Sequence, residues 1–388
     1  MNLKGRRIHI VRSAASNWDV TRVAYAHSMV AKLVDSLVER GATFVLPFGK
    51  EPFLDGRTDG PAQTFDWTVA ATLHQAVLAG RASPEGPNGK LITTIATAKT
   101  ADQIPTTRRP IYDGFRDRNA LRSEFIEPGW SAGAFRRQRL AQLGDILIGI
   151  SGGEGVEHLA LEYSTKGKPV IPLDLNLGSS QHDGSGGAAR LFLRALAKPA
   201  DFFQVVRGAS PADLLDRTRT HDGSAKIDTV VPALIALMEA LLPPRVFYIR
   251  LLNSSTAEYP SVEGFFRKTV DTFVKELGYE PCQMGIGENQ FAWMNEAIFQ
   301  SLHHSSVALF DATGVRPNCF MEFGYALGNR QRVIATHRKD TKLPFDSSMI
   351  ESFPWEETED PTLQLARFRD HWVRNINMPT IVRPTEAR

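Results

Sequence analysis

The chain has 388 residues, more than an average single domain, so two domains are expected. Hydrophobic residues make up 42% and charged residues 23%, and the net charge of +2 predicts no strong attraction to nucleic acid or to a membrane surface. The longest apolar stretch, residues 230–242, is too short to cross a bilayer, and two cysteines fit a reducing compartment, so a cytoplasmic protein is expected.

The first half of the chain alternates strand and helix patterns. A short apolar strand at residues 8–11 runs into a small polar loop that begins near Ser13, and an amphipathic helix at residues 21–40 leads to a strand at residues 43–46. This βαβ opening predicts a doubly wound parallel sheet, and residues 100–130 are interpreted as irregular. The further elements expected in this half are helices at 65–78, 134–143, 156–166 and 188–196, and strands at 90–97, 145–150 and 168–173.

A glycine-rich turn follows the apolar strand at residues 145–150 and leads directly into a helix. A strand, a glycine turn and a helix in this order present backbone N–H groups and the positive end of the helix dipole to a phosphate. A second polar cluster precedes the helix at residues 188–196. It is either a further anion or ribose contact on the same rim or a flexible loop. The candidate ligand-binding residues on this rim are Ser13, Gly152, Gly153, Glu154, Gly155, Asp183, Gly186 and Gly187.

Two arginines, Arg136 and Arg137, precede Asp145 by nine and eight residues. Together with the glycine turn, this pattern resembles the SLOG superfamily over roughly residues 6–240. The best-known members of that superfamily are the LOG-type nucleotide phosphoribohydrolases, which carry an Arg-Lys pair and a GGxGTxxE loop. Here Val156 and Leu159 stand at the Thr and catalytic Glu positions. Without that carboxylate, the resemblance implies a nucleotide sensor that has lost catalysis.

A helix predicted at residues 229–242, with Thr229 as its cap, ends at a Pro-Pro pair that marks the domain boundary. The two domains are therefore expected at residues 1–242 and 245–388. The second half again alternates strand and helix patterns, which predicts a second doubly wound α/β domain. Its expected elements are strands at 246–249, 280–284, 307–310 and 333–336, and helices at 262–277 and 291–303.

Residues 311–328 carry the densest group of candidate site residues. Asp311 ends an apolar strand, and open α/β sheets bind ligands at the carboxyl ends of their strands. A Gly-Val-Arg-Pro turn follows, and Asn318 is well placed to cap the next helix. Glu322 then falls in or just beyond the first helical turn. Taken singly, Asp311 is more simply interpreted as a strand-end cap and Glu322 as a solvated helix residue, but their combination favours a site.

The pattern D-x-T-G-x-R-P-N-x-x-x-E-x-G-Y-A-x-G over these residues resembles the core motif of TIR-like domains related to nucleoside deoxyribosyltransferases. The resemblance extends from about residue 245 to the C-terminus. It implies that Glu322 attacks or stabilises the sugar carbon of an N-glycosidic bond. Asp311 and Asn318 would then hold ribose hydroxyls or orient Glu322. The remaining candidates are Arg250 and Arg316 for phosphate, each equally a solvated surface residue, and Tyr325 for base stacking, which is otherwise core packing.

Fusions of SLOG-like sensors to TIR-like effectors are a pattern in bacterial antiphage immunity. The resemblance therefore implies a glycohydrolase that uses NAD as substrate, needs no cofactor and assembles into a homo-oligomer on binding a nucleotide-derived second messenger. The adjacent pair His303-His304 lacks a second cluster at ligand spacing, so no metal site is predicted. Two alternatives remain: a non-catalytic nucleotide-binding assembly module, and a constitutive deoxyribosyltransferase or nucleoside hydrolase.

Overall fold

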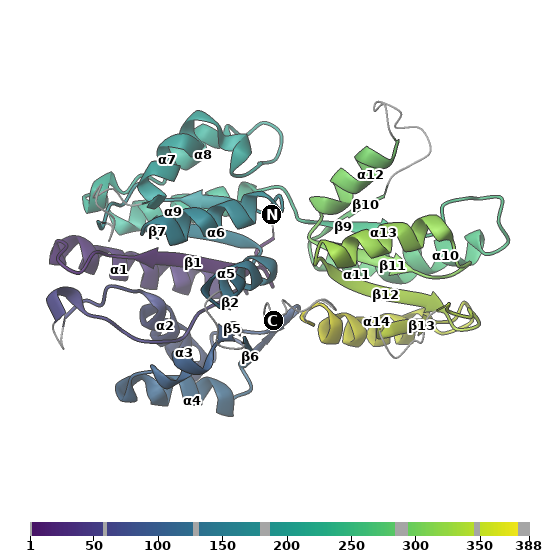
Figure 1. Ribbon diagram of the computed structural model, residues 1–388, viewed down its shortest axis with the longest axis horizontal. Helices are drawn as coiled ribbons and strands as arrows, with labels where there is room; N and C mark the ends of the chain where they lie inside the picture. The colour runs from purple at the N-terminus through teal and green to yellow at the C-terminus, as the bar shows by residue number, and fades with distance from the viewer. Residues whose placement is uncertain are drawn as a thin grey trace. The chain divides into compact units, whose positions relative to one another are not determined.

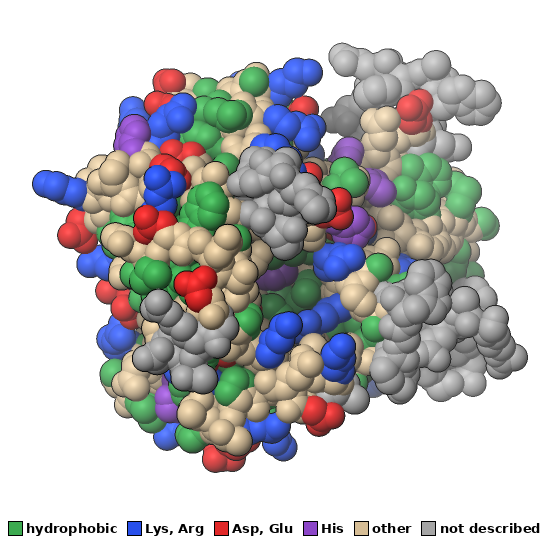
Figure 2. Space-filling view, turned by 60° about the vertical axis from the view of Figure 1, so that its left-hand side comes forward, with side chains coloured by type: hydrophobic (Ala, Val, Ile, Leu, Met, Phe, Trp, Pro, Cys, Tyr) green, Lys and Arg blue, Asp and Glu red, His purple; other side chains and the backbone are tan. Residues whose placement is uncertain are grey.

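The computed structural model describes residues 2–56, 60–126, 132–178, 187–283, 294–344 and 350–378. The chain divides into two compact units, and the main division falls between Leu242 and Pro243. Unit 1 comprises Met1–Gly86 and Lys90–Leu242, and unit 2 comprises Pro87–Gly89 and Pro243–Arg388. In the ranges described, no helix is both long and apolar enough to span a membrane. Basic and acidic side chains are mixed over the face drawn in Figure 2.

Unit 1 is built on a six-stranded parallel sheet in the order β6-β5-β2-β1-β7-β8 (Figure 1). The chain fills one half of this sheet outward from β1 and then crosses back to add β7 and β8, so the strand order reverses between β1 and β7. Ligands bind open α/β sheets at such a switch point. The strands are β1 (Arg7–Ser13), β2 (Thr43–Val45), β5 (Ile92–Ala96), β6 (Leu121–Phe125), β7 (Ile146–Ser151) and β8 (Val170–Pro172), and a separate pair joins β3 (Glu85–Gly86) to β4 (Gly89–Lys90).

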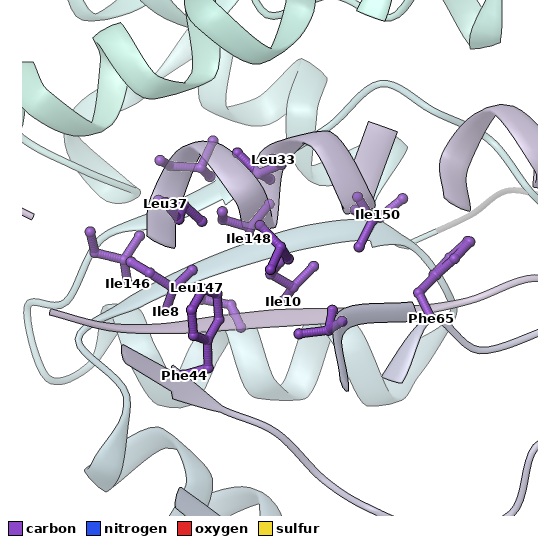
Figure 3. Close-up of a cluster of buried hydrophobic side chains, with 14 of the residues drawn as sticks. Ile8, Ile10, Leu33, Leu37, Phe44, Phe65, Ile146, Leu147, Ile148 and Ile150 are labelled. Carbon is purple, nitrogen blue, oxygen red and sulfur yellow. The ribbon is translucent and has the colours of Figure 1, made fainter. Parts of the chain in front are cut away.

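The core of unit 1 forms where helices pack on this sheet. Figure 3 shows Leu33 and Leu37 of the first helix over Ile8 and Ile10 of β1 and Ile148 of β7. Strands buried on both faces favour such continuous apolar runs, and each fully buried side chain of this size contributes about 1.5–3 kcal/mol. The helices are α1 (Val20–Val38), α2 (Asp66–Leu78), α3 (Ala98–Asp102), α4 (Arg109–Asp117), α5 (Ala132–Leu143), α6 (Glu154–Ser164), α7 (Gly187–Ala197), α8 (Pro211–Asp216) and α9 (Ile227–Ala240).

Two expectations for unit 1 were wrong. Residues 100–126 are not irregular, because they contain most of α3, all of α4 and the edge strand β6. β6 reads LRSEF, and its polar side chains conceal it in the sequence. Glu124 of this strand accepts two hydrogen bonds from Arg139, at 2.7 and 2.9 Å, so its charge is paired. The helix expected from residue 229 begins at Ile227 after Lys226, so Thr229 is not its cap.

Unit 2 contains a five-stranded parallel sheet in the order β10-β9-β11-β12-β13, with its switch point between β9 and β11 (Figure 1). Alternate strand residues belong to two separate buried clusters, one with α10, α11 and α14 and the other with α12 and α13, so helices cover both faces. Both units are therefore doubly wound α/β folds, as predicted. The strands are β9 (Arg245–Ile249), β10 (Glu280–Cys282), β11 (Val307–Asp311), β12 (Arg332–Arg338) and β13 (Ser352–Trp355). The helices are α10 (Tyr259–Phe265), a π-helical turn (Phe266–Val270), α11 (Asp271–Glu276), α12 (Met294–His303), α13 (Pro317–Gly328) and α14 (Pro361–Asn375).

Candidate functional site

The helix α13 presents three of the predicted site residues on one flank. Its face toward the sheet carries its three buried residues, Cys319, Phe323 and Ala326. At about 100° per residue, Asn318, Glu322 and Tyr325 all fall on the same side of that buried face. The Tyr325 ring contacts Phe299 of α12, with the ring centroids 4.7 Å apart, so this flank faces α12. The fold thus brings these three candidates together.

Glu322 is half-buried, and no hydrogen bond or ion pair links it to any residue within the described ranges. Burial in this position raises the pKa of Glu322 from 4.5 to about 7. An unpaired carboxyl group that is removed from water costs free energy in its charged form, and such groups concentrate at functional sites. At neutral pH the two protonation states of Glu322 are therefore both populated.

Glu322→Gln should raise the free energy of unfolding at pH 8 relative to the parent chain, but not at pH 4. The folded-state pKa of about 7 lies above the ordinary value of 4.5, so the folded state loses stability as pH rises between these values. Glutamine cannot ionise and escapes this loss, which we expect to be about 1–3 kcal/mol. Urea unfolding of both proteins at several pH values measures the difference. A difference that does not change with pH would show that Glu322 ionises normally in the folded chain.

Asp311 does not face the solvent but is 1% exposed at the end of β11. Its carboxylate accepts hydrogen bonds from Thr336 Oγ1 at 2.6 Å, from Trp355 Nε1 at 2.9 Å and from the backbone N–H of Thr313 at 3.1 Å. Burial raises the pKa of Asp311 in spite of these donors. The residue therefore ties the ends of β11, β12 and β13 to the turn before α13, instead of offering oxygens to a ribose.

The turn between β11 and α13 differs from the sequence expectation. Arg316 is the N-cap residue of α13 and Pro317 its first residue, so Asn318 lies inside the helix and does not cap it. Asn318 is exposed, and Arg316 is partly buried without a hydrogen-bond or ion-pair partner among the described residues. Val315 has φ 48°, a left-handed conformation that costs a β-branched residue about 1–2 kcal/mol. Strain of this kind is often held at binding sites.

Arg250 follows β9 and is not open to a ligand in this structure. Its side chain is 4% exposed, and its Nη1 donates to Glu263 Oε2 at 2.7 Å. Both Nε and Nη2 donate to Gln283 Oε1, at 3.1 and 2.8 Å, and the guanidinium lies 4.6 Å from the ring centre of Phe266. These contacts occupy the donors that a phosphate needs. The structure thus separates Arg250 from the residues on the flank of α13.

Tyr325 is 36% exposed, and a hydrogen bond of 3.2 Å joins its hydroxyl to Nδ1 of His303 in α12. From the sequence, His303 was considered only as a metal ligand, and this contact was missed. The available signal was the position of His303 at the end of α12, the helix that packs on α13. The hydrogen bond fixes the orientation of a partly open aromatic ring one turn from Glu322. In the ranges described, no group of three or more His, Cys, Asp or Glu side chains is placed to hold a metal ion.

In unit 1 the switch point lies between Ser13 and Ser151, which end β1 and β7 and are paired in register. Ser151 has φ 53°, and its hydroxyl donates to Gly178 O at 3.1 Å and accepts from the N–H of Leu177 at 2.9 Å. It therefore joins this strand end to the loop after β8. Ser151 was not among the candidates predicted from the sequence, although it immediately precedes the glycine pair.

The two glycine clusters of unit 1 meet at this edge. The N–H of Gly187 donates to Gly152 O, and a side chain at Gly187 would lie 3.0 Å from Gly153 O. Gly152 itself has φ 79°, and its N–H donates to Ser13 O at 3.1 Å. Close backbone approach thus explains Gly187, and the left-handed φ explains Gly152. Asp183 and Gly186 lie outside the described residues.

Gly152→Ala should lower the free energy of unfolding of unit 1 by roughly 2–4 kcal/mol. The left-handed φ of 79° is strained for alanine, and the added Cβ would lie 2.4 Å from Cγ2 of Val156. Gly155→Ala is the matched control, because its Cβ meets no atom within 4 Å and alanine favours the helix. Urea unfolding of the two variants tests this. Equal stability of the two would show that Gly152 is dispensable for the turn.

Arg136 and Arg137 diverge from the same helix turn of α5. Arg136 Nε donates to Ile95 O at 2.9 Å, beside the carboxyl ends of the strands, and burial lowers the pKa of its guanidinium. Arg137 Nε instead donates to Nδ1 of His158 on α6 at 3.2 Å. Arg136 is therefore bound to the sheet, whereas Arg137 contacts α6, the helix that follows the glycine turn.

The first turn of α6 carries negative charge. Glu154 is exposed, and Glu157 Oε1 accepts from Arg190 Nη2 of α7 at 2.6 Å. Val156 and Leu159, at the positions of the Thr and catalytic Glu of LOG-type enzymes, are 5% and 2% exposed in the core. These apolar side chains supply no polar group to a bound ligand, so the position of the glycosidic carboxylate in those enzymes is apolar here.

The chain resembles known proteins over unit 1 in particular. The family model ATP nucleosidase Cap17-like, N-terminal, matches residues 3–238. ATP nucleosidase Cap17 of Escherichia coli strain KTE188 is 22% identical over 269 residues, which cover 68% of this chain and 52% of that protein. The chain thus spans about half the length of the curated relatives it matches.

A solved structure was also found, the X-ray structure of TM1055. The match is 19% identical and covers 48% of this chain and 81% of the chain of TM1055, but the TM-score of 0.27 is too low to show a shared fold. The family model, in contrast, covers more than half of the chain. The chain therefore belongs to the ATP nucleosidase Cap17-like family, through the family's N-terminal region.

Proposed function

We propose that the chain cleaves the N-glycosidic bond of a nucleotide at Glu322, with NAD as the substrate, and that unit 1 binds the nucleotide signal that controls this cleavage. The observation that carries the proposal is the half-buried carboxyl of Glu322, which has no hydrogen-bond or ion-pair partner among the described residues and whose pKa burial raises to about 7. It lies with Asn318 and Tyr325 on one flank of the helix that follows the central strand of the sheet. The name of the curated relatives, ATP nucleosidase, supports the reaction class.

Cleavage of an N-glycosidic bond develops positive charge on the ribose. An ionised Glu322 on one face of the sugar stabilises that charge or forms an ester with the anomeric carbon. The nicotinamide ring of NAD is cationic and leaves as a neutral base, so no proton has to be supplied. Asn318 is placed to contact a ribose hydroxyl and Tyr325 to contact the base. Asp311 acts beneath them by holding the strand ends in place.

ATP is the second candidate substrate. The name of the relatives favours it, and so does the raised pKa of Glu322, because adenine is a poor leaving group unless it is protonated. A protonated Glu322 serves as the general acid for that departure, whereas NAD cleavage uses the ionised form. The two substrates thus require opposite protonation states of the same side chain.

The pH dependence of kcat/KM should therefore distinguish the two substrates. For NAD, kcat/KM should rise through about pH 7 as Glu322 ionises; for ATP it should fall over the same interval. Base release is followed chromatographically between about pH 5 and 9, with the Glu322→Gln variant as the inactive control. Base release that does not depend on pH, or that persists in this variant, contradicts this role for Glu322. No release with any nucleotide added would leave the non-catalytic assembly module as the function.

For unit 1 we propose a nucleotide ligand at the edge formed by Ser13, Ser151 and the Gly152–Gly153 turn. Because Glu154 and Glu157 make the start of α6 acidic, the groups that suit it are ribose hydroxyls or a base amino group. Arg137 and Arg190 supply the positive charge for phosphate nearby. We further propose that this ligand promotes a homo-oligomer that is active in antiphage defence. A coupling of about 1–3 kcal/mol between ligand and assembly suffices for such control.

The test of this control measures sedimentation and base release together, with and without a panel of cyclic and linear nucleotides. We expect one nucleotide to increase both the assembled fraction and the rate. Arg137→Ala with Arg190→Ala should remove the response without changing activity at saturating assembly. A rate that is independent of every nucleotide would mean a constitutive nucleosidase.

A further inference from the structure

The carboxyl edge of the unit 2 sheet holds an arginine that the site above does not use. Arg338 ends β12, the neighbour of β11. Its backbone N–H donates to Thr313 Oγ1 at 2.9 Å, and its Nη1 donates to Ser261 Oγ of α10 at 3.1 Å. The backbone of Arg338 is thus tied to the turn before α13 and its guanidinium to a helix on the other face of the sheet, while its side chain remains 29% exposed.

Three arginines of the described residues differ in what they offer: Arg250 directly after β9, Arg316 in the turn between β11 and α13, and Arg338 at the end of β12. Arg250 is 4% exposed, with its donors occupied. Arg316 has no contact that fixes its guanidinium in the part of the chain described. Arg338 combines a fixed position with exposure. A cation that is held in place before binding loses less conformational entropy when a ligand arrives, so Arg338 is the best prepared of the three for an anion.

An anion already contacts this guanidinium. Asp340, in the exposed loop after β12, accepts from Arg338 Nε at 2.6 Å and has a side chain that is 67% exposed. An ion pair so open to water contributes little to stability, and a ligand displaces it easily. Nη2 of Arg338 has no hydrogen-bond partner in the described ranges. Displacement of Asp340 therefore frees the Nε and Nη2 donors, the fork that binds phosphate in a bidentate manner.

We propose that Arg338 binds a phosphate group of the nucleotide whose ribose lies at Glu322. The inference rests on the proposed function and names a phosphate subsite for it. Neighbouring strands lie about 4.8 Å apart, which places β12 roughly 5–10 Å from the crevice between β9 and β11. That is the reach from a ribose to its own 5′-phosphate. Glu322 approaches from the α13 face and Arg338 is anchored by Ser261 on the α10 face, so the nucleotide lies across the edge of the sheet.

The experiment measures binding by calorimetry in the full chain carrying Glu322→Gln, which prevents turnover. NAD is compared with nicotinamide riboside, which has the nicotinamide and its ribose but neither the phosphates nor the adenosine of NAD. Arg338→Gln should weaken NAD binding at least about tenfold and leave nicotinamide riboside unchanged. Asp340→Asn should have the opposite effect and strengthen NAD binding a few-fold, because it removes the competing anion. Lys339→Gln, in the same loop and 67% exposed, is the matched control for general charge.

Unchanged NAD binding in Arg338→Gln overturns the proposal, as does equal weakening for NAD and nicotinamide riboside, or no binding of either by the parent protein. If Arg338→Gln fails to fold, Asp340→Asn decides, and weaker or unchanged NAD binding in that variant overturns the proposal. The phosphate subsite and the proposed activity are tested by different measurements. NAD binding that depends on Arg338, without base release by the parent enzyme, keeps the subsite and removes the activity. Base release that is insensitive to Arg338→Gln keeps the activity and removes the subsite.

Discussion

Glu322→Gln should lower the rate of N-glycosidic cleavage at least about 100-fold while the chain stays folded. Glutamine has nearly the size of glutamate but carries no charge, so it cannot stabilise the positive ribose or form an ester with it. Its pH-dependent gain in stability comes from the same property, since the group that burial holds at a pKa of about 7 is removed. We therefore expect one substitution to reduce activity and raise stability at pH 8, a combination typical of functional carboxylates.

The measurement is base release at saturating substrate, with Glu357→Gln as the control. Glu357 is an exposed glutamate of the same unit, and glutamine there should leave the rate within about twofold of the parent. Substrate binding to Glu322→Gln, measured by calorimetry, shows whether the site is intact. Full activity in Glu322→Gln would remove this residue from the mechanism. Equal losses in both variants would point to a general effect of charge on the unit.

Asp311→Ala should lower the free energy of unfolding of unit 2 by about 3–5 kcal/mol. The substitution leaves the Trp355 indole N–H buried without its acceptor and leaves the Thr336 hydroxyl with only its longer bond of 3.4 Å to Phe310 O, and a buried donor without an acceptor costs about 1–3 kcal/mol. Thr336→Val is the graded control. It removes one donor at nearly constant volume and should cost about 1–2 kcal/mol.

Urea unfolding followed by tryptophan fluorescence reports this difference, because Trp355 and Trp372 are both buried in unit 2. The activity of the folded fraction separates structure from chemistry. If Asp311 positions the strand ends, Thr336→Val keeps most of the activity. If Thr336→Val lowers the rate of cleavage about 100-fold without lowering the free energy of unfolding, Asp311 acts directly in catalysis.

Buried strands and their turns were predictable from the sequence. The apolar runs of β7 and β11 mark strands that are covered on both faces, and the residues after them are placed by a geometry that parallel sheets share. Glu322 and Tyr325 could be assigned to one helix flank from spacing alone. The edge strands β6 and β13 could not be found in this way, whereas the edge strands β8 and β10 were predicted. β13 reads SFPW, and a proline at its third position is tolerated because the strand has a neighbour on one side only.

Contacts between distant parts of the chain account for the other differences. Asp311 meets Thr336 and Trp355, which lie 25 and 44 residues further along the chain, so no local pattern reveals that this carboxylate is enclosed. Arg250 resembles a strand-end phosphate ligand until Glu263 and Gln283 are seen to occupy it. Arg338 shows the reverse case, because no motif marks it and its position depends on Thr313 and Ser261. Sequence reasoning identified the strand ends but not which side chains there remain available.

The buried residues of unit 1 and unit 2 form separate clusters, and the family model ends at residue 238, just before the division at Pro243. Each half of the gene therefore encodes the apolar side chains that its own half of the protein needs to fold. A recombination event near codon 243 would leave both cores intact. A different C-terminal unit joined at this point would therefore need no new apolar side chains from the N-terminal one.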